Sequence, residues 1–374
     1  DTALPSEFTV VVMIWPTRPD GGPQAVLSIE SNNSGTSFLL GLDVAGRPTV
    51  RVRMSDGNWT ECCLPDPVGE RRWACLWGSI SQPLGELSVG MSQGGLDDSV
   101  STTFTGSTVL SDQKINSIVV AACDQDERHM HFNGKIERPT IYSAQLGSGM
   151  LLDSTEATTA PIFACWDFCK EFSSTRVIDT GVNQLHGTLV NYPARAMTGA
   201  NWDGSEMCWR HAPQHYGAIH FHEDDIYDFE WETDFSFTVP EDLRSGVYGI
   251  RLKHGKHQDT IPLFVCPPLG QRTSRLCLLV STFTYTIYGN HARPDYEASW
   301  QDKIKAWDAY PWNPAQYPHY GCSTYNFHSD RSGICHASHR RPLFNLRPGY
   351  LTFGANTCSG LRHFQADSHL TAWL

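Results

Sequence analysis

The most conspicuous group of potential metal ligands lies in the segment HAPQHYGAIHFHEDD, residues 211–225. His220 and His222 are two positions apart, which on a β-strand puts both imidazoles on one face, as a cupin-like metal site requires. The alternative is that the histidines line a wet edge or an interdomain surface and bind backbone groups. The spacing leaves both interpretations open. The group comprises His211, His215, His220, His222, Glu223, Asp224 and Asp225.

A second group of candidate ligands consists of tyrosines. Tyr285 and Tyr288 are three positions apart at the end of the apolar run RLCLLVSTFTY, and Tyr325 lies in the turn-rich segment GCSTYNFHSDRSG. The apolar run, residues 275–285, predicts a parallel strand buried on both faces, whose carboxyl end is where ligands bind in open α/β sheets. Tyrosines at such an edge either reach a ligand or close the rim of the sheet with their hydroxyls in water. Position alone does not decide between these roles.

A cysteine nucleophile is a weaker hypothesis. Cys358, in GANTCSGL, has Gly360 two positions later, but Asn356 stands where a nucleophile elbow has its first glycine. The chain has 12 cysteines, spread over its length, which predicts free and mostly buried thiols instead of a disulfide framework. Cys165 and Cys169 form a lone CxxxC pair without a second pair of ligands, which does not predict a zinc site.

Three segments are predicted from the hydrophobic patterns. Short β-rich runs with Gly, Asn and Asp between them indicate a β-sandwich over residues 1–205. Its stretch HFNGKIERPTIYSAQL resembles the closing strand of laminin-G or concanavalin-like jelly rolls. Residues 206–268 form a β-rich connecting segment, and residues 269–374 form the start of an α/β domain. Within the last segment, PDYEASWQDKIKAWDAY and the final residues are predicted to be helical.

Composition excludes several classes of partner. The 374 residues carry a formal charge of −12, and no extended run of Lys and Arg could follow a phosphate backbone, so we expect neither nucleic acid nor an anionic membrane as partner. No stretch reaches the roughly 18 apolar residues that span a bilayer. With no targeting signal in the sequence, the cytoplasm is the default expectation. Because the first residue is Asp1, we also expect the natural amino terminus to lie upstream.

Several longer strings together resemble one enzyme family. They are HYGAIHFHEDDIYDFEW, TFTYTIYGNHARPDY, YPHYGCSTYNFHSDRSG, RRPLFNLRPGYLTF and SGLRHFQADSHLTAWL. Each would be weak alone, but together they are similar to the large (beta) subunit of the N,N-dimethylformamidases. The resemblance implies a laminin-G-like sandwich, a catalytic fold like that of class I glutamine amidotransferases, and a separate small subunit. It further implies a mononuclear non-haem iron held by two tyrosines and a glutamate.

Transferred to this sequence, the tyrosine ligands correspond to Tyr285 and Tyr325, with Tyr288 as a close rival of the first. The glutamate motif of the family is expected beyond Leu374. Two phenolates and a carboxylate are hard anionic donors that favour ferric iron, and three protein ligands leave positions for water and an amide oxygen. His328 is the nearest imidazole in the sequence. It would protonate the departing amine, orient Tyr325, or simply lie on the surface of a turn.

Two functions of different classes follow. The first is a fragment of an iron-dependent amidohydrolase that converts N,N-dimethylformamide or a similar small N-substituted amide to amine and formate, in a hetero-oligomer with its small subunit. On its own, such a fragment is expected to bind iron weakly and to be inactive. The alternative is a carbohydrate- or protein-binding lectin-like module. The sequence lacks a compact calcium-binding cluster of Asp and Asn, although DQDE at residues 124–127 keeps that alternative open.

Overall fold

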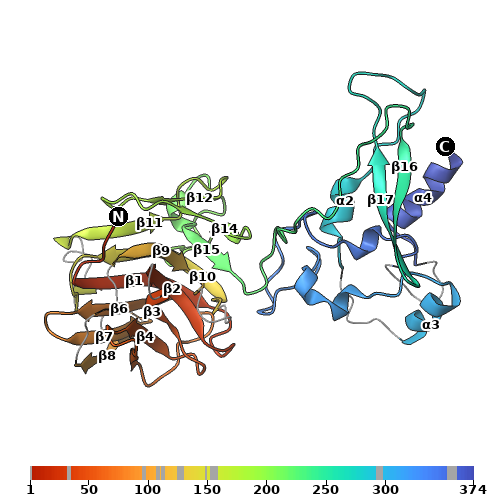
Figure 1. Ribbon diagram of the computed structural model, residues 1–374. Coiled ribbons are helices and arrows are strands. Elements are labelled where there is room, and N and C mark those ends of the chain that lie inside the picture. Colours follow the sequence, from red (N-terminus) through yellow and green to blue (C-terminus); the bar gives the residue numbers. More distant parts are fainter. Residues whose placement is uncertain are drawn as a thin grey trace. The chain divides into compact units, whose positions relative to one another are not determined.

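The chain forms two compact units. The computed structural model describes residues 2–31, 35–94, 98–106, 110, 114–123, 130–147, 150–151, 159–291, 298–351 and 360–374 (Figure 1). Unit 1 spans Asp1–Asp225 and unit 2 spans Ile226–Leu374. Among the described residues, no helix has the length and apolar character needed to cross a membrane.

Unit 1 contains two antiparallel sheets. The five-stranded sheet has the order β5 (Trp59–Cys63), β4 (Pro48–Arg53), β3 (Gly35–Leu42), β2 (Gln24–Ser31) and β9 (Ile115–Val120). The ten-stranded sheet runs β13 (Gly187–Thr188), β12 (Arg176–Asp179), β11 (Ile162–Asp167), β10 (Gly134–Tyr142), β1 (Glu7–Pro16), β6 (Ala74–Ser81), β7 (Glu86–Ser92) and β8 (Val100–Thr105). To it are added β15 (Ala218–Phe221), which pairs with β10, and β14 (Ala194–Met197), which pairs with β15.

The two sheets pack face to face around one apolar core. Along β1, Phe8, Val10, Val12 and Ile14 are at most 1% exposed, because side chains two apart point to the same face of a strand. The ring of Phe8 meets that of Phe38 on β3 with centroids 5.1 Å apart, which joins the sheets across the core. The β-sandwich that the sequence predicts is confirmed.

The boundary of the sandwich unit differs from the expected position near residue 205. β15 completes the edge of β10, since Gly134–Glu137 of β10 pair with Ala218–Phe221 while Thr140–Tyr142 pair with β11. Strand pairing therefore keeps residues 206–225 in unit 1, and the units divide between Asp225 and Ile226. The sequence pattern in this stretch is β-rich, but it does not reveal which sheet the strand joins.

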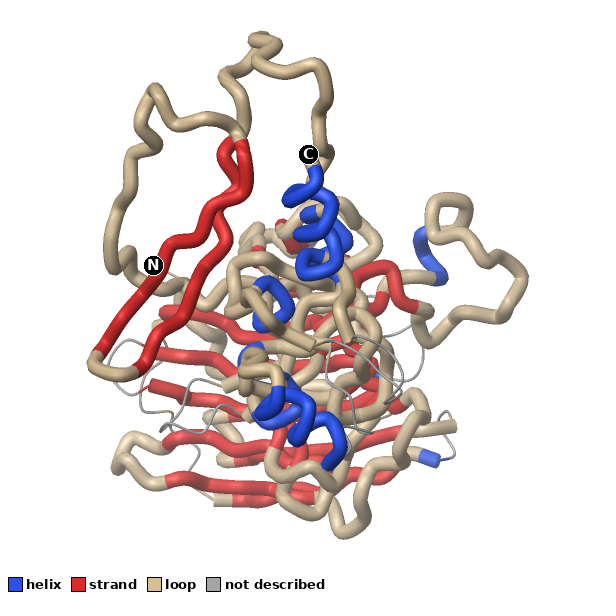
Figure 2. The backbone as a smooth tube through the Cα atoms, turned by 90° about the vertical axis from the view of Figure 1, so that its right-hand side faces the viewer, coloured by secondary structure: helices blue, strands red, loops and turns tan. Residues whose placement is uncertain are grey.

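Unit 2 contains one hairpin and several short helices. β16 (Gly246–His254) and β17 (His257–Val265) pair along their full length and form an extended ribbon in both views (Figures 1 and 2). The α-helices are α2 (Thr282–Ile287), α3 (Ala298–Ala306) and α4 (Phe364–Trp373), and the 3-10 turns are η4 (Pro314–Gln316), η5 (Pro318–Tyr320) and η6 (Phe344–Leu346). A further 3-10 turn, η3 (Pro213–His215), belongs to unit 1. The helices predicted in the last segment are present as α3 and α4.

The buried parallel strand predicted over residues 275–285 is wrong. Leu276 and Leu279 are 70% and 89% exposed, and the residues from Thr282 onward are helical. An apolar run becomes a buried strand only where neighbouring strands satisfy its backbone groups and helices cover its faces. Within the described part of unit 2, the hairpin β16–β17 is the one sheet, and this run does not join it. The amidotransferase-like arrangement stays a prediction.

A candidate tyrosine site in unit 2

Helix α2 carries the two tyrosines of the TFTYTIY motif in different directions. Tyr285, in the middle of the helix, is 2% exposed, and its hydroxyl donates a hydrogen bond to the carboxylate of Asp367 on α4. Tyr288 follows the last helical residue and closes the helix through its backbone N–H, which bonds the carbonyl of Thr284 at 3.1 Å. The two side chains therefore have separate partners despite their close spacing.

Tyr288 meets Tyr325, a residue that is distant in the sequence. Its hydroxyl donates to the Tyr325 hydroxyl at 2.8 Å, and the two rings stack with centroids 4.2 Å apart and planes 14° apart. Tyr325 is 52% exposed, so the pair is accessible from the surface of unit 2. Of the three predicted tyrosine ligands, Tyr288 and Tyr325 are the two whose hydroxyl oxygens meet.

The segment before Tyr325 is bonded directly to the end of α2. Thr324 donates from its backbone N–H and from Oγ1 to the carbonyl of Ile287, at 3.2 and 3.0 Å. Ser323 and Asn326 close the turn around Tyr325, because Ser323 Oγ donates to Asn326 Oδ1 at 3.1 Å and accepts the Tyr325 N–H at 3.1 Å. This local chemistry of short polar residues fixes the backbone on which Tyr325 stands.

Asn290 ties the surrounding loops together. It is 1% exposed and has φ of 58°, a left-handed conformation that asparagine tolerates better than most residues. Its Nδ2 donates to the carbonyls of Pro342 at 2.6 Å and Gly321 at 3.1 Å, and its Oδ1 accepts the Phe344 N–H at 2.9 Å. One side chain thus joins two stretches of backbone, near Gly321 and at Pro342–Phe344, to the end of α2.

Arg341 has a similar role with a charged side chain. It is 6% exposed and donates to the carbonyls of Cys322 at 2.6 Å, Ser338 at 3.0 Å and Gly289 at 3.3 Å. Burial lowers the pKa of the Arg341 guanidinium to about 10, which leaves it charged at neutral pH. The carbonyl dipoles therefore replace the water that this cation loses on folding.

Two imidazoles that the sequence did not single out lie beside the tyrosine pair. The His363 ring is 4.4 Å from the Tyr288 ring, and the His291 ring is 6.1 Å from the Tyr325 ring, centroid to centroid. The Arg362 guanidinium lies 5.3 Å from the centroid of Tyr288. His291 could have been noticed as the imidazole three positions after Tyr288. No local pattern marks His363, which folding brings to the site from the start of α4.

The surroundings of the site shift the pKa values of two of the tyrosines and of His363. Burial, and then the hydrogen bond to Asp367, raises the pKa of Tyr285 well above its ordinary value. The hydrogen bond from Tyr288 raises the pKa of Tyr325. Burial and the adjacent Arg362 lower the pKa of His363, which favours its neutral form, able to accept a proton. A cation would have to displace the phenol protons to bind this pair, as metal ions do.

His328 lies in the turn after Tyr325. It is 7% exposed, its backbone N–H bonds the carbonyl of Ser332 at 2.9 Å, and its carbonyl accepts the Arg331 N–H at 2.9 Å. Asp330, which is 3% exposed, accepts from the N–H and the hydroxyl of Ser332. His328 is therefore a buried turn residue, which does not fit the interpretation of a surface side chain. Its part in catalysis stays a prediction.

The histidine group of the sandwich unit divides into buried and exposed members. His220 and His222 are 5% and 7% exposed with ring centroids 4.1 Å apart, so their predicted common face is confirmed. His211 is exposed and contacts Glu206 at 3.1 Å, and His215 lies 3.7 Å from Asp203. Cys358, the candidate nucleophile, lies outside the described residues. The acidic stretch 124–127 also lies outside them.

Fold and site together define a two-unit protein, an antiparallel β-sandwich followed by a unit with paired tyrosines beside two histidines. Residues 194–374 match the family described as "N,N-dimethylformamidase beta subunit-like, C-terminal". The N,N-dimethylformamidase beta subunit of Paracoccus aminophilus is 31% identical over 398 aligned residues, which cover 98% of this chain and 51% of that protein. The Alcaligenes sp beta subunit is 30% identical over 401 residues, with the same two coverages.

Residues 194–374 are thus similar to the C-terminal part of the N,N-dimethylformamidase beta subunits, and the similarity to the two curated beta subunits extends over nearly the whole chain. The chain spans about half the length of these curated relatives.

Solved structures resemble part of the chain only distantly. The carbohydrate-binding module CBM40 of the Ruminococcus gnavus IT-sialidase, bound to α2,3-sialyllactose, is 16% identical with a TM-score of 0.34, covering 40% of this chain and 82% of the module. Domains LG4-5 of the mouse laminin α1 chain are 13% identical with a TM-score of 0.28, covering 37% of this chain and 35% of theirs.

Proposed function

We propose that this chain forms part of an amide hydrolase of the N,N-dimethylformamidase type, with Tyr288 and Tyr325 as two ligands of a ferric ion. The observation that carries the proposal is the 2.8 Å separation of the two hydroxyl oxygens. It is close to the distance between adjacent ligands of an octahedral ion with bonds of about 2.0 Å. Two phenolates are hard anionic donors suited to a trivalent ion. This donor pair therefore fits the iron that the family resemblance implies.

The choice between the two tyrosines of α2 rests on their partners. Tyr285 is buried against α4, and its hydroxyl is bonded to Asp367, whereas the hydroxyl of Tyr288 already meets that of Tyr325. The resemblance favours Tyr285 as the first ligand and leaves Tyr288 as its rival. We assign the ligand role to Tyr288. Tyr285 then positions α2 against α4.

The expected reaction is hydrolysis of a small N-substituted amide. The carbon–nitrogen bond breaks, the oxygen of water bonds to the carbonyl carbon, and the departing nitrogen takes up a proton. When bound, a ferric ion supplies Lewis acidity toward the carbonyl and acidifies water. The protein must then move protons, and the neutral imidazole of His363, whose pKa is lowered, can accept one from water and donate it to the amine. His328 remains a second candidate for this role.

Further parts of the proposal concern assembly and fold. The relatives are named as beta subunits, so we propose that this chain works in a hetero-oligomer with a small subunit. We also propose that the sandwich is a jelly roll of the laminin-G or concanavalin-like type. The third iron ligand is expected to be a glutamate beyond Leu374.

The test uses the longer protein, produced with its small subunit and loaded with iron. Three single variants make the comparison: Tyr288→Phe, Tyr325→Phe and, as matched control, Tyr285→Phe. We expect the phenolate-to-iron absorption band and amide hydrolysis to be lost in the first two variants and kept in the control. Circular dichroism checks that all three fold. If Tyr285→Phe loses the band while Tyr288→Phe keeps it, the ligand assignment is wrong. If no variant affects the band, the tyrosine site itself is refuted.

A further inference from the structure

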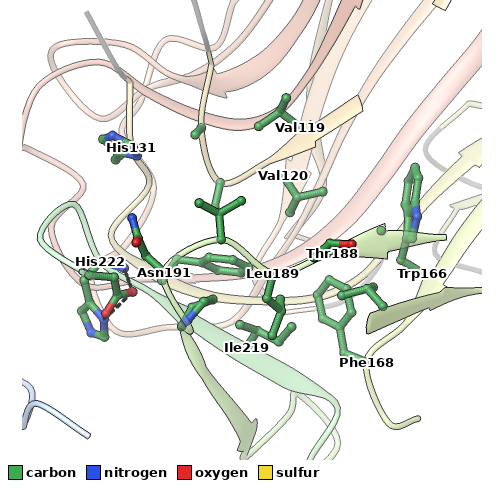
Figure 3. Close-up of a pocket in the computed structure, with 18 of the residues that line it drawn as sticks. Val119, Val120, His131, Trp166, Phe168, Thr188, Leu189, Asn191, Ile219 and His222 are labelled. Carbon is green, nitrogen blue, oxygen red and sulfur yellow. Dashed lines mark hydrogen bonds and ion pairs between the residues drawn. The ribbon is translucent and has the colours of Figure 1, made fainter. Parts of the chain in front are cut away.

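The sandwich unit contains a pocket where its two sheets differ in width. The five-stranded sheet ends at β9, whereas the ten-stranded sheet continues past β10 into β11, β12 and β13. Residues of β9, β11, β12, β13 and β15 and of the loop after β13 line a space of about 580 Å³ (Figure 3). Val190 in that loop is 78% exposed, so the pocket opens to solvent. Its volume is typical of sites for small molecules.

Most of the pocket wall is apolar. Trp166 and Phe168, which are buried, lie toward one end of it (Figure 3). Several other lining side chains pack against the hydrophobic core but stay only partly buried: Ile118, Val120, Leu189 and Phe221. A ligand with an apolar body would remove this concave apolar surface from water, which favours its binding.

Ionisable and polar side chains gather toward the other end of the pocket. His131, Asn191 and His222 lie toward this end in Figure 3, and Glu223 and Asp225 also line the pocket. Among the described residues that line it there is no Lys or Arg. The charged groups of the lining are therefore carboxylates, which attract a cation and repel an anion.

The two carboxylates differ in their partners. Glu223 forms an ion pair with Arg18, whose Nη1 lies 2.6 Å from Glu223 Oε1. Asp225 contacts His222: its Oδ2 accepts the backbone N–H at 3.0 Å, and both carboxylate oxygens lie 3.3 Å from His222 Nδ1. The Asp225 side chain is 16% exposed, so water screens its charge only partly. Asp225 is the better anchor for a cation, because Glu223 shares its charge with Arg18.

The loop that borders the pocket has an unusual backbone. Asn191 and Tyr192 have φ of 59° and 52°, left-handed values that bulky residues rarely adopt. Such conformations persist only where the surroundings impose them, and they cluster at ligand sites. Here the Asn191 side chain lies toward the polar end of the pocket (Figure 3). Its amide offers a ligand one carbonyl acceptor and two N–H donors.

We propose that this pocket binds a small organic cation, a protonated amine that carries an apolar body. The ammonium group donates a charge-assisted hydrogen bond to the Asp225 carboxylate. The apolar body lies against the wall that includes Val120 and Leu189. The proposal concerns unit 1 alone and does not depend on the hydrolase activity proposed for the longer protein.

The test compares three compounds with the same phenylethyl body and different polar ends: 2-phenylethylamine, 2-phenylethanol and 3-phenylpropionate. Isothermal titration calorimetry with the complete chain at neutral pH measures their affinities. We expect the amine to bind at least about 10-fold more tightly than the alcohol, because its hydrogen bond to a carboxylate is charge-assisted. The carboxylate compound should bind most weakly, since it meets charges of its own sign.

Three variants locate the site. Asp225→Asn keeps an acceptor for the His222 N–H but removes the charge, so it should weaken amine binding about 10- to 100-fold and leave alcohol binding nearly unchanged. Asp224→Asn is the matched control, because it removes the neighbouring carboxylate, which is not among the described residues that line the pocket. Leu189→Trp fills the apolar part and should weaken binding of the amine and the alcohol alike.

Three outcomes would overturn the proposal. A wild-type chain that binds none of the compounds at millimolar concentration refutes the pocket as a binding site. Equal affinities for the amine and the alcohol refute the class of ligand. A loss of amine binding in Asp224→Asn as large as that in Asp225→Asn refutes the position of the anchor. If circular dichroism shows that Leu189→Trp does not fold, the two nearly isosteric Asp→Asn variants decide.

Discussion

Replacing Asn290 with alanine should loosen the loops that hold the tyrosine pair. The side chain donates to the carbonyls of Gly321 and Pro342 and accepts from the Phe344 N–H while it is 1% exposed. A buried hydrogen bond is worth roughly 1 kcal/mol net, and a donor left without a partner costs a further ~1–3 kcal/mol. Alanine also tolerates the left-handed backbone poorly. We expect the free energy of local opening of these loops to fall by about 4 kcal/mol.

Hydrogen exchange followed by mass spectrometry measures this directly, because local opening limits amide exchange in folded proteins. A change of about 4 kcal/mol corresponds to roughly a 1000-fold faster exchange where opening is local. We expect this acceleration in peptides covering residues 320–326 and 341–346, and unchanged exchange in the β-sandwich.

The control substitution is Asn313→Ala. Asn313 also bonds a backbone N–H, that of Ala315 at 3.0 Å, but at the start of an exposed 3-10 turn. Loss of this hydrogen bond should lower the stability of the turn by about 1 kcal/mol. If Asn290→Ala accelerates exchange in the two loops by less than Asn313→Ala does in its own turn, the role assigned to Asn290 is refuted.

Two further predictions concern packing and thiol chemistry. A methyl group on Gly90 would clash with the Trp77 indole in the sandwich, so Gly90→Ala should lower the free energy of unfolding by ~1–3 kcal/mol. Gly147→Ala places its added carbon with no atom within 4 Å and should leave the free energy of unfolding nearly unchanged. Thermal unfolding measures both, and equal melting temperatures would contradict the packing. Burial raises the pKa of Cys75 to about 11, so at pH 8 only about one thiol in a thousand is ionised. Iodoacetamide should therefore alkylate the exposed Cys266 far faster, with Cys75 reacting more readily only as the pH rises, and equal labelling at pH 8 would contradict this.

Much of the sandwich could be predicted because its strands and turns follow from patterns within short stretches of sequence. The alternation of apolar residues along β1 and the turn residues between the strands predict short antiparallel strands wherever they occur. The same holds for His220 and His222. Their two-residue spacing puts both side chains on one face once the segment is a strand. The edge of the unit was harder to place, because the partner of β15 is β10, a strand distant in the sequence.

Unit 2 shows what local pattern cannot decide. The apolar run before Tyr285 has the composition of a buried strand, yet Leu276 and Leu279 are exposed because no strand pairs with them in the described structure. An apolar run favours a buried position. Whether another element covers it depends on how the whole chain folds, which the run itself does not encode.

By itself the sequence determined the strand-rich first unit, the negative net charge and the similarity to the N,N-dimethylformamidase beta subunits, since these depend on residue types and their order. Only the tertiary structure decided which tyrosine meets Tyr325. Tyr285 and Tyr288 are three positions apart and chemically identical, and their roles separate because α4 supplies Asp367 to one while the turn after Ser323 brings a second phenol to the other. Those contacts join distant parts of the chain, and no local spacing encodes them.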